Sequence, residues 1–172
     1  MKDYAFTIIA SGLDPAADDF EDRFFEAGCD DATLSFQKGR IVLEFDRAAR
    51  SLAEAISSAF MDVSRAGAIV ERFEPDHLVS LSDIAARSGL SRAAISLYCK
   101  GERGKRFPAP VARVTSESPL WEWPEVARWM CEFGKLPADA VVEADVLRKA
   151  NSLTQQRAAP AQFAKALKAR AA

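Results

Sequence analysis

A chain of 172 residues has room for one large domain or two small ones, and its 49% content of hydrophobic residues is enough to build packed cores. This composition excludes the class of disordered proteins. No stretch approaches the roughly 18 consecutive apolar residues of a transmembrane helix, which excludes that class as well. The residues after Met1 lack the apolar stretch of a signal peptide, so we expect a cytoplasmic protein.

The residue types that support catalysis or metal binding are sparse. The three cysteines, Cys29, Cys99 and Cys131, are far apart without Cys-x-x-Cys spacing, which argues against a disulfide framework or a zinc site. The single histidine, His77, has no neighbours that suggest a Ser-His-Asp arrangement, and there is no Gly-rich phosphate loop. We therefore expect no metal and no cofactor, and we predict that the protein is not an enzyme.

The net charge of −2 hides an uneven distribution along the chain. Residues 1–77 carry 8 Lys or Arg against 16 Asp or Glu, a net charge of −8. Residues 78–135 carry 9 against 6, and residues 136–172 carry 6 against 3, so each of these segments has a net charge of +3. Such an asymmetry of sign predicts separate surfaces with different partners.

The first segment, residues 1–75, shows six elements in the order strand, helix, strand, strand, helix, strand. Asp14 can cap a helix that begins at Pro15, and Lys38-Gly39 can form a tight hairpin turn between two alternating apolar runs. The expected elements are a strand over 4–10, a helix over 15–27, strands over 32–36 and 41–45, a helix over 47–65 with a buried stripe of Leu52, Ile56, Ala59, Phe60 and Val63, and a strand over 68–73. This order predicts an α+β fold that begins with an acidic, ferredoxin-like βαββαβ sandwich.

A second domain is expected over residues 78–135, after a polar linker at residues 74–77 that contains Pro75. Its elements are shorter than those of the first domain. They are a helix over 83–87 capped by Ser82, a turn at 88–90, a helix over 91–100 capped by Ser91, short strands over 111–114 and 120–123, and a third helix that begins at Pro124. This succession predicts a helix-turn-helix followed by a hairpin and a helix.

Three residues at fixed spacing carry the helix-turn-helix interpretation. Gly89 supplies the positive φ that the tight turn needs, Ala85 is small enough to let the two helices cross, and Ile95 can anchor the second helix in the core. Between residues 87 and 113, seven Lys or Arg face only Glu102, a local net charge of +6 in an otherwise acidic protein. Phosphate neutralisation and counterion release favour such a patch.

Three stretches of this domain resemble the MerR/AlpA (excisionase-like) winged-helix proteins. They are Leu81–Lys100, the extended Phe107-Pro108-Ala109-Pro110-Val111, and the run Leu120-Trp121-Glu122-Trp123-Pro124-Glu125-Val126-Ala127-Arg128-Trp129-Met130. The resemblance is confined to residues 80–133. It implies DNA binding by the second helix, with the hairpin as a wing against the backbone or the minor groove. The loop Gly101–Arg106 is longer and more basic than is usual in that family, which leaves the path of the wing open.

Carried over to this chain, the resemblance implies that Ser91, Arg92, Ala93 and Ser96 face DNA bases, and Arg92 could read guanine by a bidentate contact. Four cations are expected to contact phosphates and position the protein: Lys100, Arg103, Lys105 and Arg106. The three tryptophans, Trp121, Trp123 and Trp129, are predicted to pack in the core rather than to stack on bases.

The remaining segments each leave two interpretations open. Residues 136–172 are expected to hold a helix over 138–157 and a basic tail. This helix either forms a homodimer for binding two DNA half-sites or packs on its own domain. The N-terminal domain is either an interaction module with an acidic surface or, from the order of its elements alone, an ACT-like sensor with a ligand beside residues 11–14.

The sequence as a whole predicts a transcriptional regulator that binds specific double-stranded DNA sites through the recognition helix 91–100 and a basic wing. The alternative is an antitoxin-like or inhibitory protein whose acidic N-terminal domain binds a partner protein and whose helix-turn-helix serves autoregulation. An enzyme is disfavoured because the acid pairs Asp18-Asp19 and Asp30-Asp31 have the character of solvated charges.

Overall fold

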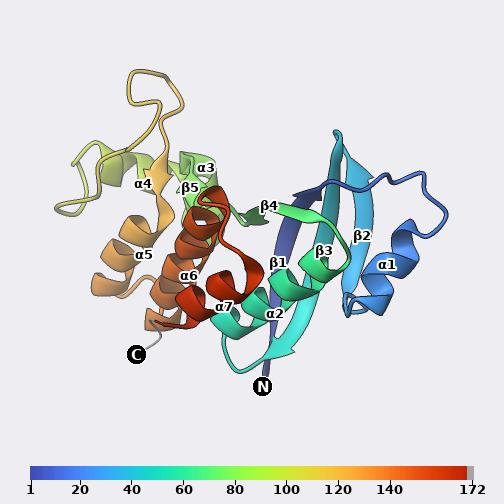
Figure 1. Ribbon diagram of the computed structural model, residues 1–172. Coiled ribbons are helices and arrows are strands. Elements are labelled where there is room, and N and C mark those ends of the chain that lie inside the picture. Colours follow the sequence, from blue (N-terminus) through green and yellow to red (C-terminus); the bar gives the residue numbers. More distant parts are fainter. Residues whose placement is uncertain (170–172) are drawn as a thin grey trace. The chain divides into compact units, whose positions relative to one another are not determined.

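The computed structural model describes residues 1–169, which form a mixed α+β protein (Figure 1). The chain divides into two compact units. Unit 1 combines Met1–Pro75 with the chain from Val146 onward, and unit 2 comprises Asp76–Asp145. Within the described residues no helix is both long enough and apolar enough to cross a lipid bilayer.

Unit 1 is built on a four-stranded antiparallel sheet with the strand order β2-β3-β1-β4. The strands are β1 (Lys2–Ser11), β2 (Ala32–Gln37), β3 (Arg40–Ala49) and β4 (Ile69–Glu74). Alternate side chains of the two central strands are buried on one face, where Phe6 of β1 stacks on the opposite Phe45 of β3 with ring centroids 5.3 Å apart. Helices α1 (Phe20–Glu26) and α2 (Leu52–Arg65) contribute their buried residues to the same core.

The predicted hairpin turn and the buried stripe of α2 are confirmed, while the cap of α2 is a residue that the sequence analysis did not name. Lys38 and Gly39 join β2 to β3 with φ values of 51° and 77°, as a two-residue turn with two positive φ angles requires. Ser51 caps α2, because its side chain accepts a hydrogen bond from the backbone N–H of Glu54. All five residues of the predicted stripe are buried: Leu52, Ile56, Ala59, Phe60 and Val63.

The predicted start of the first helix is wrong. The Asp14 carboxylate accepts a hydrogen bond from the N–H of Ala16, and the Asp14 carbonyl accepts one from Ala17, so these residues form a turn. An Asp side chain that bonds two residues ahead competes with helix formation in this way. The helix α1 therefore begins only at Phe20 and is half as long as the sequence predicts.

Arg47 lies on β3 and not at the start of α2 as predicted, because the pairing of β3 with β1 continues to Ala49. Its side chain is 9% exposed and forms ion pairs of 2.7 Å with Asp31 and with Asp62 of α2. It also donates a hydrogen bond to the carbonyl of Gly28. Asp31 is therefore a partner of a buried cation rather than the solvated charge that the sequence predicts.

The C-terminal helix α6 (Ala138–Gln155) begins in unit 2 and ends in unit 1, and α7 (Pro160–Lys168) lies in unit 1. Pro160, predicted as an interruption, is the first residue of α7, a position that suits its fixed φ. Phe163 of α7 is fully buried and stacks on Phe60 of α2 with ring centroids 3.9 Å apart. Residues 136–172, predicted as one segment, are thus shared between the units, and 170–172 lie outside the described residues.

Asn151 of α6 closes one edge of the sheet. Its side-chain amide accepts a hydrogen bond from the N–H of Phe73 at 2.8 Å and donates one to the Phe73 carbonyl at 3.0 Å. Phe73 lies on β4, which is an edge strand. The amide thus replaces the neighbouring strand that this residue lacks.

Unit 2 packs short elements around its own core. They are β5 (Leu78–Val79), α3 (Leu81–Ser88), α4 (Arg92–Cys99), β6 (Trp121–Glu122), α5 (Trp123–Glu132) and the first part of α6. Val79, Ile84, Ile95, Val126 and Met130 are fully buried there. β6 pairs with β5, while the predicted strand pair over 111–114 and 120–123 is reduced to a single bridge between Ala112 and Leu120.

Candidate nucleic-acid interface

The helix-turn-helix of unit 2 is formed by α3, a turn at Gly89 and α4. Gly89 follows α3 with φ 69° and ψ 9°, the left-handed conformation that the sequence predicts. Ser91 then caps α4 by accepting a hydrogen bond from the N–H of Ala94. Ile95 is fully buried and Ala85 is half-buried, so both take the positions that the spacing predicts.

The cap of α3 differs from the prediction. Ser80, and not Ser82, accepts a hydrogen bond from the N–H of Asp83, and the Asp83 carboxylate accepts one in return from the N–H of Ser80. This reciprocal capping box satisfies two backbone donors at once, which Ser82 could not do without an acid three residues later. Hydrogen bonds from the Ser80 side chain and backbone lower the pKa of Asp83.

Ser80→Ala is expected to reduce the stability of unit 2 by about 1 kcal/mol at neutral pH. Because the folded-state pKa of Asp83 is lowered, its contribution is present above the pKa of the unfolded chain and is lost as the pH falls through the folded-state pKa. The difference between the wild type and Asp83→Asn in urea unfolding should therefore shrink in acid. A difference that grows as the pH falls would contradict this assignment.

The outer face of α4 carries most of the residues predicted to face bases. Ser91, Arg92 and Ala93 are exposed, whereas Ser96 is half-buried. Arg92, Ser96 and Lys100 are spaced four residues apart, so they lie along one side of the helix. The opposite side, with Ile95 and Tyr98, is buried in the core.

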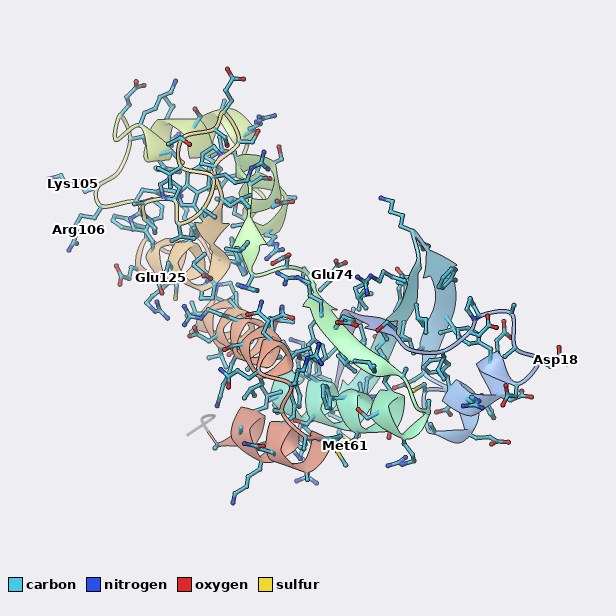
Figure 2. All side chains as sticks on the ribbon, turned by 45° about the horizontal axis from the view of Figure 1, so that its top comes forward. Asp18, Met61, Glu74, Lys105, Arg106 and Glu125 are labelled. Atoms are coloured by element: carbon cyan, nitrogen blue, oxygen red, sulfur yellow. The ribbon has the colours of Figure 1, made fainter. Side chains whose placement is uncertain are left out.

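The loop Gly101–Arg106, which we call the basic loop, is held by its backbone while its charges stay in solvent. Trp129 donates a hydrogen bond from its indole N–H to the carbonyl of Lys105 at 2.9 Å. Gly104 has φ 71°, and a Cβ there would lie 3.2 Å from carbon atoms of Tyr98 and Trp129. Figure 2 shows the side chains of Lys105 and Arg106 at the outer margin of the loop, directed away from the fold.

The aromatic residues near the basic loop are part of the core. Trp129 packs edge-on against Tyr98 and Phe107, with ring centroids 5.0 Å from each. Trp121, Trp123 and Trp129 are 3%, 7% and 6% exposed, which confirms the prediction that they pack rather than stack on bases. The guanidinium of Arg103 lies over the ring of Tyr98, at 5.6 Å from its centroid.

The cations of unit 2 differ in their surroundings. Within the described residues, no ion pair compensates the charges of seven exposed cations: Arg92, Lys100, Arg103, Lys105, Arg106, Arg113 and Lys135. Arg87 differs, because it donates a hydrogen bond to the carbonyl of Asp76 at 2.7 Å and lies over the ring of Trp123. Burial lowers the pKa of Arg87. It is therefore a packing residue, although the sequence counts it in the basic patch.

The site that results has two parts. Arg92 lies at the first turn of α4, and the basic loop follows the last turn. An eight-residue helix is about 12 Å long, so the two parts are separated by roughly that distance. The sequence places Arg113 in the basic patch but not among the DNA-binding residues. In the structure it is exposed, in the loop around the Ala112–Leu120 bridge.

Elsewhere in residues 1–169, no three side chains of His, Cys, Asp or Glu gather closely enough to hold a metal ion. The uncompensated cations on the helix-turn-helix therefore remain the strongest candidate site. Comparison of the chain with protein-family models, with curated proteins and with solved structures finds no match.

Proposed function

We propose that the protein binds double-stranded DNA through α4 and the basic loop and regulates transcription from specific sites. One observation carries this proposal. Exposed cations without ion pairs gather on α4 and the basic loop, in a protein of net negative charge. An uncompensated positive charge is costly to gather without an anionic partner, and the phosphates of a duplex supply one.

The two parts of the site suit different roles on a duplex. The first turn of α4 presents a long guanidinium beside the small side chains of Ser91 and Ala93, which leaves room for the helix end to enter a major groove. The basic loop presents Lys105 and Arg106 on an anchored backbone. We assign base reading to Arg92 and phosphate contacts to the loop.

We also propose that unit 1 is a ferredoxin-like domain and that unit 2 is a winged helix-turn-helix. The strand order of unit 1 and its alternation of strands and helices support a ferredoxin-like domain, and the bridged loop around Arg113 supports a narrow wing. These features accord with the resemblance to MerR/AlpA proteins. A regulator of transcription of this kind would act in the cytoplasm.

The test begins with selection of genomic DNA fragments that the full chain retains, followed by fluorescence anisotropy at several salt concentrations. Arg92→Ala is expected to cost about 1–3 kcal/mol on the selected sequence and little on a scrambled one. Lys105→Ala is expected to weaken binding equally on both, and to reduce the slope of log K against log salt by about 0.9. Arg50→Ala, which removes an exposed cation of unit 1, is the matched control and should change neither.

Two outcomes would count against these assignments. Equal losses on selected and scrambled DNA for Arg92→Ala would remove its reading role. Binding that is absent for the wild type, or as weak for the control as for Lys105→Ala, would reject the DNA interface itself.

A further inference from the structure

The two edges of the unit 1 sheet are built differently. On β4, the residues Glu71, Arg72 and Glu74 are charged, and the pairing with β1 shifts register at a bulge. The amide of Asn151 occupies the free backbone groups of Phe73. Charges, bulges and covering groups are the means by which proteins keep an edge strand from accepting another strand. The β4 edge is therefore protected.

The β2 edge has none of these protections. Its sequence, Ala-Thr-Leu-Ser-Phe-Gln, contains no charge and no proline, and its register with β3 is unbroken. The two-residue turn makes Gln37 and Arg40 a hydrogen-bonded pair. Because such pairs alternate along an antiparallel ladder, the backbone N–H and C=O groups of Leu34 and Phe36 point away from β3. They are available to a further strand.

A large apolar side chain lies on this free edge. Phe36 on β2 is 49% exposed. A large exposed aromatic side chain on an unpaired edge adds apolar contact area to whatever strand is added there.

The ends of β2 carry opposite charges. Asp30 precedes the strand and Lys38 follows it; both are exposed, and within the described part of the chain neither forms an ion pair. Two identical strands that pair antiparallel place the first end of one against the last end of the other. Asp30 of each copy then lies beside Lys38 of its partner, so the strand is complementary to itself in charge as well as in hydrogen bonding.

We propose that β2 pairs antiparallel with β2 of a second copy of this chain, about a two-fold axis perpendicular to the sheet. The two sheets join into one, with their helices on the same side. A second copy fits because the neutral strand brings no like charges together, although residues 1–77 carry a net charge of −8. This interface does not depend on DNA binding, and it differs from the dimerisation helix that the sequence suggests, since Ala144, Leu147 and Ala150 of α6 are buried within the chain's own cores.

The test is sedimentation equilibrium of the full chain at micromolar concentrations, with circular dichroism to confirm folding. Phe36→Lys should weaken self-association by about tenfold or more, because it places a charge on the free edge. Asp30→Lys and Lys38→Glu should each weaken it, and the double variant should restore it, because each new charge then faces its opposite on the partner. Asp18→Lys makes the same charge change in the loop before α1 and should have no effect (Figure 2).

Three results would overturn the proposal. The first is a wild type that stays monomeric throughout the micromolar range. The second is a dimer that Phe36→Lys leaves intact while remaining folded. The third is a double variant that associates no better than either single variant, which would show that these two charges do not meet.

Discussion

Replacing Arg47 by Met is expected to destabilise unit 1 by about 3–5 kcal/mol, the range for breaking a buried ion pair from one side. The guanidinium is 9% exposed and joins Asp31 to Asp62, whose side chain is 16% exposed. Burial by itself lowers the pKa of Arg47, but hydrogen bonds to both carboxylates outweigh it and raise the pKa above its ordinary value. Met fills the space of the aliphatic stem. It leaves Asp31 without its cation and Asp62 with only its 3.2 Å pair to Arg65.

Urea unfolding followed by circular dichroism would measure this loss. The three tryptophans lie in unit 2, so their fluorescence reports on that unit and not on the site of the change. Arg23→Ala is the control, because its pair with Asp19 at 2.7 Å is exposed to solvent and should contribute little to stability. Losses of similar size for Arg47→Met and Arg23→Ala would show that the buried pair does not hold the unit together.

Phe163→Ala is expected to cost about 3–5 kcal/mol in the unfolding of unit 1. Phe163 is fully buried and stacks on Phe60 at 3.9 Å, with Phe73 at 5.7 Å. The deletion leaves a cavity between α2 and α7 that the surrounding side chains cannot fill without moving. Phe163→Leu retains most of the volume and should cost less than half as much.

The same denaturation experiment includes Gln162→Ala, which changes an exposed neighbour and should leave the free energy of unfolding unchanged. If Phe163→Ala were as mild as Gln162→Ala, then α7 would not be part of the core of unit 1. The prediction therefore tests the placement of the C-terminal helix as well as the energy of the aromatic stack.

Local patterns were sufficient to predict the elements whose stability is local. The stripe from Leu52 to Val63 recurs with the period of a helix, and Lys38-Gly39 fits one type of turn. Gly89 and Ser91 likewise have a conformational or capping role that their residue types specify. These features hold because the neighbours that decide them are only a few residues away.

Apart from two helix starts, where a local Asp14 turn and the Ser80–Asp83 capping box differ from the prediction, the predictions failed where a distant segment decides the outcome. Arg47 extends β3 because β1 is opposite it, and Trp121 joins Leu78-Val79 rather than the nearer residues 111–114. The role of Phe163 depends on Phe60, about a hundred residues earlier. No window of sequence around these residues contains the partner that decides their structure.

The same distinction holds for the candidate site. The exposure of Arg92, Lys105 and Arg106 follows from their positions in a short capped helix and a glycine-containing loop. Arg87 has the same residue type and lies in the same basic stretch, yet the backbone of Asp76 and the ring of Trp123 bind it. Charge counts along the chain cannot separate these cases, because each depends on which side of a helix meets the core.

Because unit 1 is completed by α7, unit 2 is an insertion between its two parts. During synthesis on the ribosome, the whole of the helix-turn-helix emerges before Phe163 and Leu167 can fill the space over α2. A nascent chain halted just after α5 would thus hold a complete helix-turn-helix beside an unfinished sheet domain, exposed to chaperones and proteases.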